Sequence, residues 1–278
     1  KKNAENIAKN AVGSTFAEIS KSEMEDIEIS LPPLSEQKRI SSILSSFDNK
    51  IEQLKKQNNI LEDIAQSIFK EWFVKYNFPN KDGKPYKDNN GKMIDSELGL
   101  IPEGWRVGRL GELVSNFISG DYGKEIPDNI YNTESICIRG TDLQEVLYGN
   151  PEKAPRRFLK KKSITEKLLQ PGDLIIEISG GTEGQSTGRA CYINQEFLDR
   201  FNLPMTCVNF CKIVRPKRGF TYPLYSYIQY FYNKGLFFNY ENGSTGIKNL
   251  SLEAVFEDIP MALPPLDLLT NFEIEISA

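Results

Sequence analysis

The chain has 278 residues, a formal net charge of −4 and a hydrophobic content of 39%. Because it contains no histidine, histidine-based acid–base catalysis, histidine metal ligands and Ser-His or Cys-His nucleophile pairs are excluded. We therefore expect no metal site. No apolar run approaches the roughly 20 residues that span a membrane, so we expect no membrane partner.

Three short motifs near the N-terminus recur in the same order near the C-terminus. One recurs at an offset of 230 residues and the other two at 232. They are Gly13-Ser14-Thr15 and Gly243-Ser244-Thr245, Glu25-Asp26-Ile27 and Glu257-Asp258-Ile259, and Leu31-Pro32-Pro33-Leu34 and Leu263-Pro264-Pro265-Leu266. This period is too long for a solenoid, so it predicts two large modules with the same ending. Residues 1–34 are then the C-terminal end of the first module.

Residues 35–76 are predicted to form one long helix. Ser35 is a suitable N-cap, and Glu36 suits the positive end of the helix dipole. Apolar residues then recur at alternating steps of four and three for more than four heptads, which indicates a coiled-coil seam with one polar insertion. The seam consists of Ile40, Leu44, Phe47, Ile51, Leu54, Asn58, Leu61, Ala65, Ile68 and Trp72. The alternative is a long helix that packs only on its own globular domain.

Residues 77–100 are rich in Lys, Asp, Asn and Gly, which predicts a solvated linker. From 101 to 265, β-rich runs at 135–139, 173–178, 190–193 and 207–214 alternate with turns, and residues 223–240 have helical spacing. We expect a compact α+β domain there, followed by the start of a second helix at 266–278. The cysteines Cys137, Cys191, Cys207 and Cys211 include no Cys-x-x-Cys pair and lie in apolar runs. They therefore predict buried thiols in a reducing cytoplasm.

Basic residues concentrate in the globular region. Residues 104–250 contain 19 Lys and Arg against 15 Asp and Glu, whereas the remainder contains 15 against 23. Clusters of this kind indicate phosphate contacts, although a solvated surface explains them equally well. One cluster contains Lys153, Arg156, Arg157, Lys160, Lys161 and Lys162, and a second contains Lys212, Arg215, Lys217 and Arg218.

Three polar, glycine-bearing loops are candidates for DNA contact. Residues 179–189 lack the Gly-Lys-Ser/Thr of a P-loop and precede a predicted strand, so nucleotide binding is not favoured. Gln and Arg can read base edges, whereas Ser and Thr suit phosphates. The candidates are Gly181, Thr182, Gln185, Ser186, Thr187 and Arg189, with Ser244, Thr245 and Lys248 in a second loop and Arg139 and Thr141 in a third. The alternatives are a polar hairpin without a ligand and, for Arg189, a structural role at a strand end.

Taken together, these segments resemble the specificity (S) subunit of Type I restriction-modification enzymes. The resemblance rests on the repeated ending, the junction from Leu31 to Ile40, the connector from Phe78 to Tyr86 and the opening Ile101-Pro102-Glu103-Gly104-Trp105. It implies a target recognition domain with a twisted β-sheet and flanking helices, joined to a long conserved spacer helix that pairs antiparallel with a second one.

The resemblance also implies a cytoplasmic, non-catalytic subunit of a bacterium or archaeon. Such a subunit binds double-stranded DNA, reads half of a bipartite site and docks modification (M) subunits. The M subunits hold S-adenosylmethionine, and a restriction (R) subunit uses ATP and Mg²⁺, so no cofactor is expected in this chain.

Two features depart from the family pattern. Only residues 1–34 represent a first recognition domain, and the second helix has only residues 267–278, so a half-length form would need a second copy. The rival interpretation is a coiled-coil scaffold whose globular domain binds protein. An enzyme with an unrecognised active site is disfavoured by the missing histidine and the absence of methylation or nuclease motifs.

Overall fold

The computed structural model describes residues 18–182, 184–243 and 247–277. The chain divides into two compact units, residues 1–57 and 58–278. In the first, helix α2 (Lys21–Glu25) begins at a capping box in which Ser20 and Glu23 bond reciprocally. The first copy of the Gly-Ser-Thr motif lies outside the described residues.

The predicted long helix is confirmed as α3 (Leu34–Phe69), which continues as one π-helical turn, η1 (Lys70–Val74). In this turn the backbone N–H of Lys75 donates to the carbonyl of Lys70 at 2.8 Å. Most of the predicted seam is open to solvent. Ile40, Leu44, Phe47, Ile51, Leu54 and Leu61 are between 45% and 62% exposed, Asn58 is exposed, and Ala65, Ile68 and Trp72 are half-buried.

The second unit alternates short strands with short helices, which confirms the α+β class. Its strands are β1 (Met93–Ser96), β2 (Gly99–Pro102), β3 (Arg106–Arg109), β4 (Val114–Ser119), β5 (Thr133–Ile138), β6 (Arg156–Leu159), β7 (Leu174–Glu177), β8 (Ser179–Gly180), β9 (Ala190–Tyr192), β10 (Met205–Cys207), β11 (Cys211–Pro216), β12 (Glu241–Asn242), β13 (Lys248–Leu250) and β14 (Pro260–Leu263). Its helices are α4 (Leu143–Leu147), α5 (Lys161–Lys167), α6 (Gln195–Asp199), α7 (Thr221–Asn233), α8 (Leu252–Asp258) and α9 (Leu266–Ser277), with 3₁₀ turns at Lys87–Asn89, Leu110–Leu113, Gly140–Asp142 and Leu236–Tyr240.

The strands form several small sheets rather than one large sheet. The antiparallel sheet β4-β11-β7-β9 is central, and a second sheet, β10-β5-β6, pairs β10 parallel to β5. Successive side chains of a strand point to opposite faces. Accordingly, Leu174 and Ile176 of β7 enter one hydrophobic core, whereas Ile175 enters another. Both faces of the central sheet are therefore buried.

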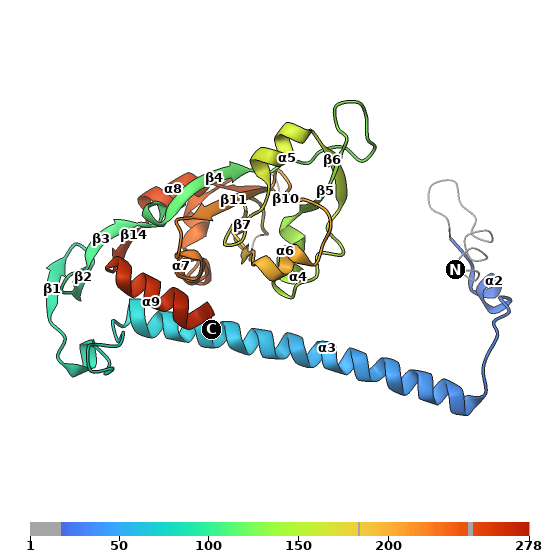
Figure 1. Cartoon of the computed structure of the whole chain (residues 1–278), viewed down its shortest axis with the longest axis horizontal. Helices are drawn as coiled ribbons and strands as arrows, with labels where there is room; N and C mark the ends of the chain where they lie inside the picture. Colours follow the sequence, from blue (N-terminus) through green and yellow to red (C-terminus); the bar gives the residue numbers. More distant parts are fainter. Residues whose placement is uncertain (1–17, 183, 244–246, 278) are drawn as a thin grey trace. The chain divides into compact units, whose positions relative to one another are not determined.

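Helix α9 runs antiparallel to the last turns of α3 (Figure 1). Phe272 is fully buried, and its ring centroid lies 6.1 Å from Phe69, 5.7 Å from Trp72 and 5.0 Å from Phe73. Each aromatic pair of this kind contributes beyond its buried area. The end of the long helix thus belongs to the core of the globular domain.

Three local expectations differ from the structure. The region expected to be a linker contains the β1–β2 hairpin, and the Phe78 ring stacks between Tyr86 and Trp105. The expected strand at 207–214 is two strands, because residues 208–210 form a turn. The expected helix at 223–240 stops at Asn233, since Gly235 has φ +70° and opens a separate 3₁₀ turn.

The four cysteines are buried and unpaired, as expected. Burial raises the pKa of the Cys137 and Cys211 thiols to about 12. No helix within the described ranges is long and apolar enough to cross a membrane.

Candidate nucleic-acid interface

An exposed basic surface covers β6 and the start of α5. We call Arg156, Lys160, Lys161 and Lys162 the basic patch. The side chains of Arg156 and Lys162 are 70% and 87% exposed, and among the described residues each forms one long ion pair, to Glu134 at 3.7 Å and to Glu166 at 3.8 Å. Such exposed pairs contribute little and are easily exchanged for another anion. The patch is thus free to contact phosphates.

Arg157 does not belong to this surface, although it is adjacent in sequence. Its side chain is only 9% exposed and pairs with Glu125. Its Nη2 donates to the Tyr122 hydroxyl at 2.8 Å, and the guanidinium lies 4.5 Å from that ring's centroid. Neighbouring residues of a strand face opposite sides, so Arg156 points to solvent and Arg157 packs inward. The expectation that Arg157 contacts phosphate is corrected on this ground.

Two of the candidate loops, those with Gly140 and Gly180, lie against the buried carboxylate of Glu177. A Cβ placed on Gly140 or Gly180 would lie 2.4 or 2.7 Å from Glu177 Oε1, so a larger residue at either turn would displace the Glu177 carboxylate. Strand β8, which contains Gly180, pairs with β13 at Lys248. Glu177 gave no signal in the sequence, because it appears there as the polar end of an apolar run.

Glu177 holds Arg189 in a fixed orientation. Arg189 Nε donates to Glu177 Oε2 at 2.9 Å, and Nη2 donates to Oε1 at 2.7 Å. This contact with the carboxylate raises the pKa of Arg189. The Nη1 end of the guanidinium points away from the pair, and the side chain is 35% exposed. Both Arg189 and Gln185 line a cavity of about 370 Å³, and the lining of this cavity also includes Glu62 and Asp63 of α3.

Other residues of the glycine-rich loop are divided between surface and interior. Thr182 and Gln185 are exposed, and Gly181 is half-buried with φ +73°. Ser186 and Thr187 are 3% and 0% exposed, and the Thr187 N–H donates to Glu241. Burial removes Ser186 and Thr187 from the residues that can touch DNA directly.

The second and third loops contain ion pairs as well. Lys248 pairs with Glu241 at 3.0 Å, and Ser244 and Thr245 lie outside the described residues. Arg139 pairs with the buried Asp142 through Nε and Nη2, both at 2.9 Å, and Thr141 is exposed beside it. Thr141 is therefore the more accessible of the two candidates in the third loop.

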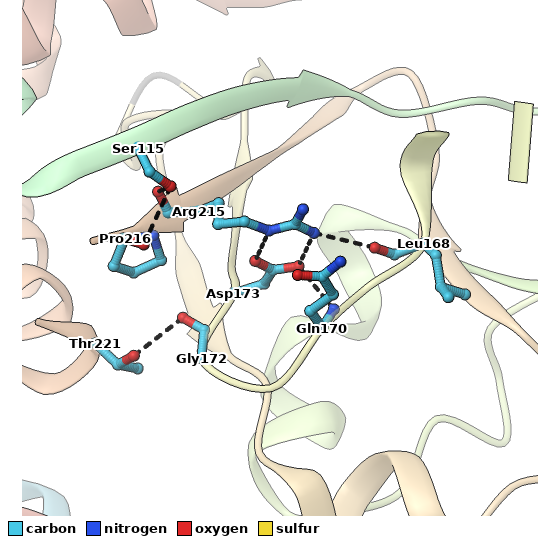
Figure 2. Close-up of polar contacts among 8 residues, drawn as sticks. All are labelled: Ser115, Leu168, Gln170, Gly172, Asp173, Arg215, Pro216 and Thr221. Atoms are coloured by element: carbon cyan, nitrogen blue, oxygen red, sulfur yellow. Dashed lines mark hydrogen bonds and ion pairs between the residues drawn. The ribbon is translucent and has the colours of Figure 1, made fainter. Parts of the chain in front are cut away.

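The second basic cluster is largely structural. Figure 2 shows Arg215 bound to Asp173, with Nε–Oδ1 and Nη2–Oδ2 distances of 2.8 Å. Arg215 also donates to the Leu168 carbonyl at 3.1 Å, and the N–H of Gln170 donates to Asp173 at 2.8 Å. Asp173 is 1% exposed, so this pair ties β11 to the turn before β7. Lys212 pairs with Glu253.

Within the described part of the chain, no group of three or more His, Cys, Asp or Glu residues is placed to hold a metal ion. The polar network consists instead of arginine and lysine side chains held by carboxylates. Such a network can position cations and hydrogen-bond donors for an anionic ligand.

Residues 1–63 match the family model of the Type I restriction modification DNA specificity domain. The Type I restriction enzyme MjaIX specificity subunit of Methanocaldococcus jannaschii is 42% identical over 102 residues, which are 37% of this chain and 22% of that protein. The MjaVIII specificity subunit of the same organism is 31% identical over 169 residues, 60% of this chain and 36% of that protein. The chain is related to Type I specificity subunits.

The matched segments span at most 36% of these two specificity subunits. The S subunit of a Type I restriction-modification system from M. genitalium superposes with a TM-score of 0.45 at 16% identity, covering 98% of this chain and 62% of that one. Likeness at that level transfers no residue role, so the site rests on the geometry described above.

Proposed function

We propose that the chain is a DNA sequence-recognition subunit of a Type I restriction-modification complex. It reads half of a bipartite site and docks modification subunits. The observation that carries this proposal is the match of residues 1–63 to a DNA specificity domain. The basic patch supports it physically, because exposed lysines and arginines neutralise phosphates and release counterions.

In this proposal the basic patch positions the duplex and Arg189 reads a base. The carboxylate of Glu177 occupies the Nε side of the guanidinium, which leaves Nη1 and the second Nη2 hydrogen for a ligand. That edge matches the O6 and N7 acceptors of guanine in the major groove. Gln185, exposed on the same loop, suits adenine.

The expected effect of Arg189→Ala is relaxed recognition at one base position, with a cost of about 1–3 kcal/mol there and little elsewhere. Methylome sequencing of a strain with this variant measures the relaxation directly. Arg218→Ala, which removes an exposed cation outside the three loops, is the matched control. An unchanged motif in the Arg189→Ala strain would place the base reader elsewhere.

The chemistry of the complex is assigned to its other subunits. We place S-adenosylmethionine and adenine methylation in the M subunits, and ATP and Mg²⁺ in the R subunit. The exposed seam of α3 is proposed to pair with an antiparallel helix, supplied by sequence after Leu266 in a longer subunit or by a second copy. An exposed apolar stripe of this size is typical of an interaction surface.

The rival function is a coiled-coil scaffold whose globular domain binds protein. A mobility-shift titration of the intact complex over a range of salt concentrations separates the two. A recognition subunit prefers one bipartite site and loses affinity steeply as salt rises. A scaffold shows neither the preference nor the slope.

A further inference from the structure

The loop of residues 121–131, here called the isoleucine loop, joins β4 to β5 and extends past β6 in Figure 1. Ile126 at its tip is 77% exposed, the highest value for any large apolar side chain in the described residues, and Ile130 is 63% exposed. Single exposed apolar residues are ordinary on protein surfaces. Two on one loop tip need further evidence before a role is assigned.

The isoleucine loop has a defined conformation. Asp128 Oδ1 accepts the N–H groups of Ile130 at 2.8 Å and Tyr131 at 2.7 Å, and Oδ2 accepts from Lys124 Nζ at 2.7 Å. These hydrogen bonds, led by that from Lys124, lower the pKa of Asp128 to about 2, so the carboxylate is ionised at neutral pH. The backbone of Lys124 exchanges two hydrogen bonds with Phe158. The tip therefore needs little ordering before it binds a partner.

Cations surround the base of the loop. The Nζ atoms of Lys124 and Lys160 lie 4.7 and 5.2 Å from the centroid of the Tyr131 ring. The acidic residues of the loop, Asp121, Glu125 and Asp128, are each paired with a cation, Lys167, Arg157 and Lys124 respectively. Lys160 and Lys161 form no ion pair within the described ranges, so the basic patch contributes the unpaired charge beside the loop. The core of a protein–protein interface is depleted in lysine, whereas a DNA interface is strongly positive. The surroundings favour DNA as the occupant.

We propose that the isoleucine loop is a DNA wedge: Ile126 and Ile130 insert at a base step from the minor groove while the adjacent basic patch holds the phosphates. Apolar wedges of this kind partly unstack a base step and kink the duplex, and the kink brings more of the backbone against the protein. This inference rests on the proposed DNA-recognition function. It adds a contact that depends on DNA deformability rather than on base hydrogen bonds.

The test uses the complete subunit assembled with its modification subunits. The probe is a duplex that carries the strain's methylation motif and a fluorophore pair at its ends, so that energy transfer reports bending. We expect Ile126→Ala and Ile130→Ala each to weaken binding about tenfold and to reduce the bend, since each removes apolar surface that the DNA complex would bury. In both isoleucine variants the slope of log binding constant against log salt concentration stays that of wild type. Lys160→Ala reduces the magnitude of this slope by about 1.

Leu100→Ala on β2, where Leu100 is 58% exposed, is the control for the loss of an exposed apolar group. Wild-type affinity and bending in both isoleucine variants would overturn the wedge while leaving DNA recognition intact. Loss of modification subunits from these variants, but not from Leu100→Ala, would make the loop a protein contact and would also overturn it. A wild-type complex that fails to bind DNA would overturn the proposed function itself.

Discussion

Replacing Phe272 by alanine should detach α9 from the end of α3. The Phe272 side chain is fully buried and contacts three aromatic rings, Phe69, Trp72 and Phe73, all on the last turns of the long helix. Leu269 is the other fully buried residue of α9. A helix of twelve residues is too short to persist without tertiary contacts, so its position depends on this packing.

The magnitude follows from the burial. Truncation of a fully buried phenylalanine costs about 3–5 kcal/mol, because the transfer free energy is lost and a cavity remains. Since a domain is stable by only about 5–15 kcal/mol, the globular domain should still fold, but with a clearly lower urea midpoint. Any helix that continues from α9 would then lose its fixed starting point beside α3.

Urea unfolding followed by circular dichroism measures the loss of stability. Co-purification with modification subunits measures whether the position of α9 beside α3 is needed for assembly. Ile274→Ala is the matched control, because Ile274 lies on the same helix and is 62% exposed. We expect it to change stability by less than about 0.5 kcal/mol. A Phe272→Ala protein with wild-type stability and assembly would refute the idea that α9 is fixed by this aromatic contact.

Three further predictions concern charge and helix pairing. Lys160→Ala with Lys161→Ala should weaken binding to all DNA sequences alike and lower the salt slope by about 2, measured by mobility shift; a changed methylation motif would contradict phosphate contact. Burial raises the pKa of Glu62, so its ionised form lowers stability above pH 4.5. Glu62→Gln should therefore increase the urea midpoint at neutral pH, and this gain should vanish as the pH falls below 4.5. An equal gain at neutral and at acidic pH would show that the charge of Glu62 is not the cause. Replacing Ile51 and Leu54 by Asp should abolish helix pairing and M-subunit assembly, measured by size-exclusion chromatography. Normal assembly of this variant would show that the seam does not mediate the pairing.

Patterns with a regular period predicted the structure well. The heptad spacing of the seam predicted α3 correctly, because one continuous helix needs only local hydrogen bonds and a consistent apolar spacing. The apolar run at 173–178 gave β7, whose residues fill two cores. The turn at 208–210 and the break at Gly235 were missed because apolar residues continue on both sides of each. Both carried a local signal, Asn209 in the turn and Asn233-Lys234-Gly235 at the end of α7, which is the composition typical of a helix C-terminus.

The candidate site was predicted in part. The three loops were named from their glycines and polar side chains, and among the described residues Gly140, Gly180 and Arg189 lie around Glu177, with Lys248 paired to Gly180. Glu177 was missed because its role depends on contacts with Gly140, Gly180 and Arg189, and its position at the end of an apolar run does not reveal them. The isoleucine loop was missed because two apolar residues around a Pro-Asp-Asn turn have no periodic signal.

The arginines of the charge clusters and loops show why clustered charge alone does not locate a DNA surface. Arg156 is open to solvent, Arg157 packs on Tyr122, and Arg215 is bound to a buried aspartate. Arg139 and Arg189 are each held by a carboxylate through Nε and Nη2 and remain partly exposed, and Arg189 also lines the cavity that contains Gln185. An arginine held by a carboxylate loses less side-chain entropy when it meets a base than one that is free in solution. A phosphate contact needs no such restraint, because any orientation of an exposed lysine serves. In the proposed function these two tasks are separate: exposed cations on β6 and α5 supply affinity, and a carboxylate-held arginine beside the turns at Gly140 and Gly180 supplies discrimination.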